Sequence, residues 1–84
     1  MSAFELEVQW DPAKARRNLA KHQVSLALAA TVLHDPLSIT VFDAAHSLVE
    51  DRWFTLGRAE DGRLLAVAHT FEATGPASAR ARII

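Results

Sequence analysis

The chain has 84 residues, of which half are hydrophobic, and it has no cysteine and a formal net charge of −1. This length allows one domain over residues 1–84, which buries about 60–65% of the surface of its unfolded chain. The lack of cysteine excludes a disulfide framework. The near-neutral charge excludes a uniformly basic nucleic-acid-binding surface. There is no signal-peptide pattern and no run of about 20 apolar residues, so we expect a cytoplasmic protein without membrane association.

The first predicted element is a strand over residues 4–10. Apolar side chains at positions 4, 6, 8 and 10 alternate with polar side chains at positions 5, 7 and 9. A period of two is typical of a strand with one buried face.

A basic helix follows, and it begins at Asp11 and Pro12. Asp11 can accept hydrogen bonds from the first turn, and proline fits the first helical position. No acidic residue occurs from Pro12 to His34, so the positive charges of the helix have no local counterpart. Helical spacing places four polar residues on one face: Lys14, Arg17, Asn18 and Lys21. This face suits an anionic partner, while a solvated helix face is the alternative.

A second helix is predicted from Leu26 to about Leu33, with Ser25 as its cap and Pro36 ending it. Its core stripe comprises Leu26, Ala29, Ala30 and Leu33. Leu28 and Val32 lie on another side of this helix, and we therefore expect them to mediate self-association, with a homodimer as the simplest closed assembly.

Three further strands are predicted over residues 39–42, 53–56 and 64–71. The last two form a hairpin through the turn at residues 60–62, and Gly75-Pro76 precedes a final strand that starts at Arg80. This order predicts an α+β fold, with two helices packed on one face of a mainly antiparallel sheet of about four to five strands.

An ordered set of motifs along the chain resembles the BrnT family, which are ribonuclease toxins of type II toxin-antitoxin systems. The family's opening pattern W-D-x-x-K-x-x-x-N-x-x-K-H-x-V-S is matched by Trp10, Asp11, Lys14, Asn18, Lys21, His22, Val24 and Ser25. Later matches are Asp35-Pro36, Arg52-Trp53, Gly57-Arg58, His69-Thr70 and Arg82-Ile83-Ile84. The resemblance implies a RelE-like fold, RNA as substrate, a cognate BrnA-like antitoxin and no cofactor.

The sequence departs from the family pattern at three places. Gln23 replaces a glycine after the first helix, and Ala27-Leu28 replaces acidic residues at the start of the second. Family members continue beyond the Arg82-Ile83-Ile84 motif into a basic segment that this sequence lacks. The third departure favours an alternative function, a non-catalytic BrnT-like binding module that retains antitoxin binding or self-association. A third alternative is a plain structural or regulatory domain that contacts an acidic protein.

Metal-independent RNA cleavage needs a base for the 2′-hydroxyl proton, cations for the phosphorane and an acid for the leaving oxygen. His69 is the expected proton-transfer group, and Arg52 and Arg58 are the expected phosphate ligands. For each residue an alternative stays open. His69 could be a hydrogen-bonded core histidine, Arg52 could form a surface ion pair and Arg58 could be solvated.

The residues expected to bind RNA or the antitoxin are Lys14, Arg17, Lys21, His22 and Arg82. His22 has a second interpretation, because a histidine at the end of a helix also stabilises the helix terminus. The four histidines are too scattered in sequence to indicate a local metal motif, so no metal site is expected.

Overall fold

Two α-helices and six strands follow one another along residues 4–84, the part of the chain that this computed structural model describes. A short 3-10 turn, Ala44–His46, lies between the second and third strands. The elements are β1 (Glu5–Gln9), α1 (Pro12–His22), α2 (Leu26–Val32), β2 (Ile39–Phe42), β3 (Trp53–Arg58), β4 (Leu64–His69), β5 (Glu72–Gly75) and β6 (Ser78–Arg82). The predicted α+β class is confirmed, and the RelE-like assignment within that class stays a prediction.

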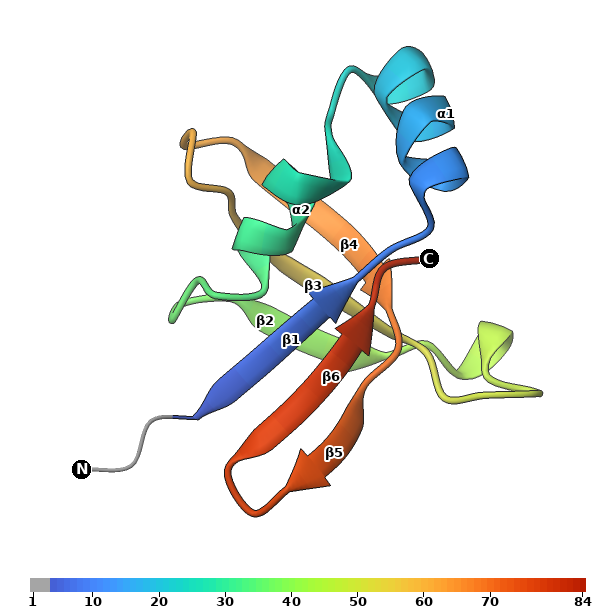
Figure 1. Ribbon diagram of the computed structural model, residues 1–84, viewed down its shortest axis with the longest axis vertical. Helices are drawn as coiled ribbons and strands as arrows, with labels where there is room; N and C mark the ends of the chain where they lie inside the picture. Colours follow the sequence, from blue (N-terminus) through green and yellow to red (C-terminus); the bar gives the residue numbers. More distant parts are fainter. Residues whose placement is uncertain (1–3) are drawn as a thin grey trace.

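The strands form two three-stranded sheets (Figure 1), whereas the sequence pattern predicts one sheet of about four to five strands. One sheet has the order β1-β6-β5, with β1 parallel to β6, and the other is the antiparallel sheet β2-β3-β4. The division occurs after His69, where the predicted strand over residues 64–71 ends early. Thr70 N–H donates to the Arg82 carbonyl at 2.9 Å, and a single bridge between His69 and Ile83 links the sheets.

The helix ends follow the local signals in the sequence. The Asp11 side chain accepts from Ala13 N–H at 2.9 Å, and the Ser25 hydroxyl accepts from Leu28 N–H at 3.0 Å. Gln23 ends α1 in the left-handed conformation, with φ of 57°, although it is not glycine. The sharp turn that separates the helices is therefore retained without the glycine of the family pattern.

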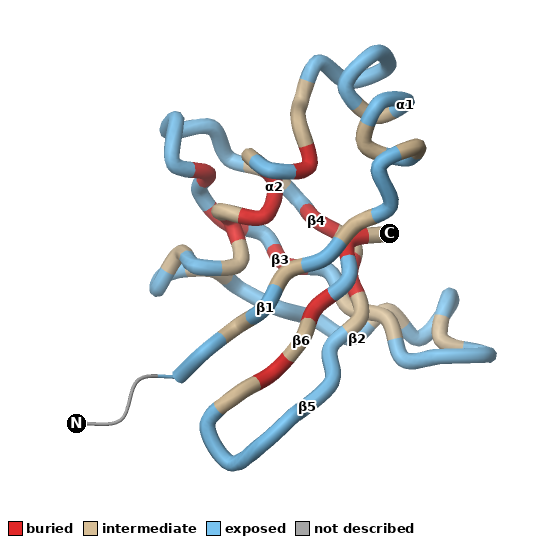
Figure 2. Tube along the Cα trace, viewed as in Figure 1, coloured by how far each residue is buried: buried red, intermediate tan, exposed pale blue. Residues whose placement is uncertain are grey.

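The core lies where α2 packs against β3 and β4 (Figure 2). Its buried members are Leu26, Ala29, Ala30, Val32, Ala59, Val67 and Ile83. The prediction that Val32 takes part in self-association is wrong, because its exposed fraction is 0%. Leu28 is half-buried and packs against the same cluster. The short helix lies against the sheet with most of its circumference covered, so its second apolar side also faces protein.

Both helices were expected to pack on one face of the sheet, but only α2 does so. α1 has no buried residue and extends from one end of the molecule (Figure 1). The half-buried Ala15 is its contact with the core cluster. Asn18 ties α1 to the following turn, since its side-chain amide donates to the Val24 carbonyl at 2.7 Å. The polar face of α1 is thereby left open to a partner.

The end of α2 is attached to β3 through Asp35. The Asp35 carboxylate accepts from Arg58 N–H at 2.8 Å and from Leu37 N–H at 2.9 Å, and these bonds lower the pKa of the carboxyl. Gly57 allows this close approach, because a Cβ there would lie 2.9 Å from the Ser38 Cβ and 3.1 Å from Val32.

Candidate functional site

The basic face of α1 borders a hollow of about 300 Å³ at the open end of the molecule. The structure brings together four of the residues expected to bind RNA or the antitoxin, namely Lys14, Arg17, Lys21 and His22, and adds Asn18, Leu26 and Ile84 to the lining. Within residues 4–84, none of these four side chains forms an ion pair. The positive charges of Lys14, Arg17 and Lys21 are therefore available to an anion.

Local sequence explains why these side chains converge. Residues at i, i+3 and i+7 of a helix share one face, and the first turn of α1 has no acidic residue. The left-handed turn at Gln23 then reverses the chain, so that Leu26 of α2 completes the hollow.

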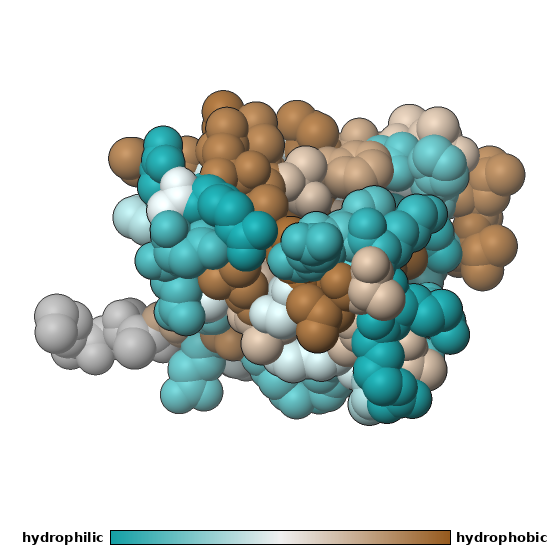
Figure 3. Space-filling view, turned by 90° about the horizontal axis from the view of Figure 1, so that it is seen from above, coloured by the Kyte–Doolittle hydropathy of each residue, from teal (hydrophilic) through white to brown (hydrophobic). Residues whose placement is uncertain are grey.

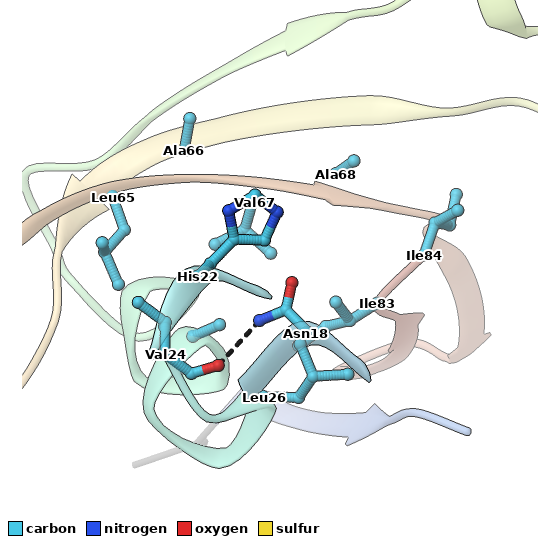
Figure 4. A pocket seen from close by; sticks show the side chains of 11 residues that line it. Asn18, His22, Val24, Leu26, Leu65, Ala66, Val67, Ala68, Ile83 and Ile84 are labelled. Atoms are coloured by element: carbon cyan, nitrogen blue, oxygen red, sulfur yellow. Dashed lines mark hydrogen bonds between the residues drawn. The ribbon is translucent and has the colours of Figure 1, made fainter. Parts of the chain in front are cut away.

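A second hollow of about 320 Å³ adjoins the first and lies between α1 and β4 (Figure 4). The two hollows share Asn18, His22, Leu26 and Ile84. In Figure 4, Asn18 and His22 of α1 lie on one side, and residues 65–68 of β4 lie on the other. Polar groups of the helix thus face the edge of a strand across an open groove.

His69, the expected proton-transfer group, lies elsewhere and has an exposed fraction of 3%. Its Nδ1–H donates to the Thr70 carbonyl at 2.8 Å, because a carbonyl can only accept, and its Nε2 accepts from the Thr55 hydroxyl at 2.6 Å. Burial lowers the pKa of His69, and the bond to Thr70 opposes this effect only in part. Both ring nitrogens are engaged inside the protein.

The two arginines expected to bind the same phosphate lie at opposite ends of β3. Arg52 directly precedes this strand and Arg58 ends it, so about 20 Å of extended chain separates them. The Arg58 guanidinium donates to the Gly62 carbonyl in the hairpin, and the Arg52 guanidinium lies 3.9 Å from Glu50. The structure therefore does not bring Arg52, Arg58 and His69 around one phosphate.

Arg82 also lies apart from the basic face of α1. Its guanidinium is 2.7 Å from the Glu50 carboxylate, with which it forms an ion pair. It borders another hollow, shared with Arg80, Asp51 and Glu72, in which both signs of charge occur. Arg82 is thus held by a neighbouring acid, unlike the cations of α1.

One feature of the β2-β3-β4 sheet was not found from sequence. The outer face of this sheet exposes Ile39, Val41, Phe54, Leu56 and Leu64. The sequence contains a signal for this exposed face, because these strands have apolar residues at both alternating positions. That pattern is typical of sheets that are covered on both sides.

The described residues give limited evidence on metals and membranes. Within residues 4–84, no three His, Cys, Asp or Glu side chains gather in a way that could hold a metal ion. None of the helices in this range has the length and apolar character needed to span a membrane.

Comparison with known proteins identifies one family. A family model described as "Ribonuclease toxin, BrnT, of type II toxin-antitoxin system" matches residues 10–84. No curated protein matches the chain. The matched range includes α1, both hollows and the β2-β3-β4 sheet.

Proposed function

The chain belongs to the BrnT family of ribonuclease toxins of type II toxin-antitoxin systems, and from this premise we propose that it is a metal-independent endoribonuclease that holds RNA on the basic face of α1. It acts in the cytoplasm when its antitoxin is absent and inhibits translation by cleaving RNA. The antitoxin partner is implied by the family.

The observation that carries this proposal is the unpaired charge beside an open hollow. Lys14, Arg17 and Lys21 line the hollow together and have no ion-pair partner within residues 4–84. Cations that contact phosphates supply most of the affinity for a nucleic-acid backbone. A local cluster of this kind serves that purpose even though the whole chain carries a net charge of −1.

We assign proton transfer to His22 instead of His69. His22 is exposed and lines both hollows, whereas the two ring nitrogens of His69 are engaged by Thr55 and Thr70. In the proposed reaction His22 takes the 2′-hydroxyl proton, the 2′-oxygen attacks phosphorus and the bond from phosphorus to the 5′-oxygen breaks. The 5′-oxygen takes a proton from water, and the protonated His22 returns its proton to the hydroxide that remains. Lys21 and its neighbouring cations stabilise the charge that develops on the phosphoryl oxygens.

The binding part of the proposal is tested by reversing charge on α1. The double substitution Lys14→Glu and Lys21→Glu should weaken binding to a fluorescent single-stranded RNA. It should also flatten the slope of log K against log salt by about 1.4, because each phosphate contact contributes about 0.7 for single strands. Arg16→Glu is the matched control, since Arg16 is exposed on the same helix but does not line the hollow. An equal effect of all these substitutions would contradict a site on this face.

The catalytic part is tested by RNA cleavage in the presence of EDTA. His22→Gln should abolish cleavage and leave RNA affinity nearly unchanged, whereas His34→Gln, at another exposed histidine, should leave both unchanged. Cleavage that persists in His22→Gln would overturn the assignment of His22, and cleavage that requires added metal would overturn metal independence.

The alternative function is a non-catalytic BrnT-like module that binds the antitoxin or itself. The separation of Arg52, Arg58 and His69 favours it, because the residues expected from sequence to cleave RNA do not form one site. Salt-dependent RNA binding without cleavage, with or without divalent metal, would support this alternative over the nuclease.

A further inference from the structure

A further hollow, of about 400 Å³, lies between the two sheets. Leu6 of β1 and Ala81 of β6 line it from one sheet, and Trp53 and Thr55 of β3 line it from the other. In the described part of the chain it shares no lining residue with the two hollows beside α1, both of which Ile84 borders. This hollow is therefore separate from the site proposed for RNA.

The walls of this hollow are largely apolar. Leu33, which directly follows α2, lines it together with the rings of Trp53 and Phe71. Within residues 4–84, none of the side chains that line it belongs to Asp, Glu, Lys or Arg. Hollows of about 300–1,000 Å³ with apolar walls and a few polar groups are typical of small-molecule sites. A charged ligand would lose its hydration here without gaining an ion pair, so the hollow favours an uncharged molecule.

A chain of hydrogen bonds in the wall fixes what the hollow offers to a ligand. Because His69 Nδ1–H donates to the Thr70 carbonyl, the neutral ring accepts at Nε2 from the Thr55 hydroxyl. Thr55 has only one hydroxyl proton, so it accepts in turn from the Thr40 hydroxyl at 2.8 Å. The single hydroxyl proton of Thr40 is thereby used, and Thr40 Oγ1 presents an acceptor to the hollow.

We propose that this hollow binds a small uncharged aromatic molecule that carries an O–H or N–H donor, such as a phenol. The donor bonds to Thr40 Oγ1, and the aromatic ring packs against Trp53 and Phe71. Aromatic rings gain from such contacts beyond the area that they bury. Because the ligand contacts residues of both sheets, it stabilises the junction between them.

The chemistry of the hollow favours a free small molecule over a nucleotide or a protein segment. A nucleotide carries a phosphate, and among residues 4–84 no cation lines the hollow to hold it. A protein segment brings backbone N–H and C=O groups that need partners, whereas only the hydroxyls of Ser38 and Thr40 remain to bond with a ligand. The inference does not rest on the proposed function, because His22 and the cations of α1 lie outside this hollow.

The test uses four probes that are titrated into the full chain at neutral pH and followed by NMR: 2-naphthol, its methyl ether, 2-naphthoate and adenosine monophosphate. We expect 2-naphthol to bind and to shift the amide signals of Leu6 and Thr55, one in each sheet. The methyl ether has no donor and should bind about two- to tenfold more weakly. The two anions should bind more weakly still.

Several outcomes of this titration would overturn the proposal. Absence of 2-naphthol binding, or amide shifts confined to one sheet, would show that the hollow is not a ligand site. Equal affinity for 2-naphthol and its methyl ether would refute the hydrogen bond to Thr40. Tighter binding of adenosine monophosphate than of 2-naphthol would show that the hollow holds a nucleotide.

Two pairs of variants locate the ligand. Thr40→Val should remove the preference for 2-naphthol over its methyl ether, whereas Thr40→Ser should keep it; both should fold, because Thr40 is exposed on the edge strand β2. Phe71→Ala should weaken both ligands about three- to tenfold. Phe54→Ala is the matched control, since Phe54 is 39% and Phe71 48% exposed but only Phe71 lines the hollow. A preference that persists in Thr40→Val, or equal effects of the two phenylalanine variants, would overturn the proposal.

Discussion

His69 shows at the scale of one residue how burial decides between two roles for the same side chain. Its neighbour Thr55 is also buried, and the Thr55 hydroxyl lies 2.8 Å from that of Thr40. Because Thr55 donates to His69, it accepts from Thr40, and the three groups form a chain of hydrogen bonds across β2, β3 and β4. Burial favours the neutral imidazole in this arrangement, because it lowers the pKa of His69, and the arrangement matches the core histidine that the sequence left open.

This placement predicts that stability falls as the pH is lowered from about 7 to 5.5. Burial lowers the pKa of His69 in the folded chain, so below about pH 6.5 the unfolded chain binds the extra proton first. The free energy of unfolding then decreases with falling pH, by at most about 1.4 kcal/mol per pH unit for one proton. Urea unfolding at several pH values measures this slope.

The matched variants for this prediction are His69→Gln and His46→Gln. His69→Gln should lose most of the slope between pH 7 and 5.5, whereas His46→Gln should keep it, since His46 is largely exposed beside Asp43. The window lies above the range in which Asp35, Asp61 and Glu7 titrate, because the pKa of each is lowered by hydrogen bonds. A wild-type slope in His69→Gln would show that another group causes the effect.

At the scale of elements, the turn between α1 and α2 offers a direct test of backbone strain. Gln23 has φ of 57° and its N–H donates to the Leu19 carbonyl at 2.8 Å. Non-glycine residues in this conformation cost roughly 1 kcal/mol, part of which glycine recovers in the folded state. Gln23→Gly should therefore raise the free energy of unfolding by about 0.5–1 kcal/mol, measured by urea denaturation. Gln23→Ala, which keeps the Cβ, should not, and equal stability of the two variants would argue against strain at this turn.

The elements also show which parts of the structure the sequence could predict. The helix caps at Asp11 and Ser25 and the hairpin between β3 and β4 depend on residues that are close in the chain, and all were predicted. The split into two sheets depends on Thr70 finding Arg82, twelve residues away, and β5 has no apolar pattern because all four of its residues are exposed.

The same difference between local and long-range information applies to the candidate site. The basic face of α1 required only helical spacing, and it was predicted residue by residue. The arrangement of Arg52, Arg58 and His69 required the register of β3 with β4, which pairs Trp53 with His69 and places Arg58 at the other end. Long-range register is not encoded in local spacing, so these three residues could be proposed from their chemistry but not placed.

At the scale of the whole molecule, the two faces of the β2-β3-β4 sheet differ. The inner face is covered by α2, while the outer face exposes a group of large apolar side chains: Ile39, Val41, Phe54, Leu56 and Leu64. Figure 3 shows apolar surface gathered along the side of the molecule on which this sheet lies. No described residue within 4–84 covers this face, and contiguous apolar patches of this kind are uncommon on monomers.

We expect self-association to occur through this outer face and not through Leu28 and Val32. Phe54→Glu should shift the chain toward monomer in light scattering and leave its circular dichroism spectrum unchanged, because Phe54 is 39% exposed and faces away from α2. Val32→Ala removes two buried carbon atoms and should lower the free energy of unfolding by about 2 kcal/mol without a direct effect on assembly. Leu28→Glu should also destabilise the fold, since Leu28 packs against the core. A wild-type chain that stays a folded monomer at high micromolar concentration would show that the outer face does not pair with itself.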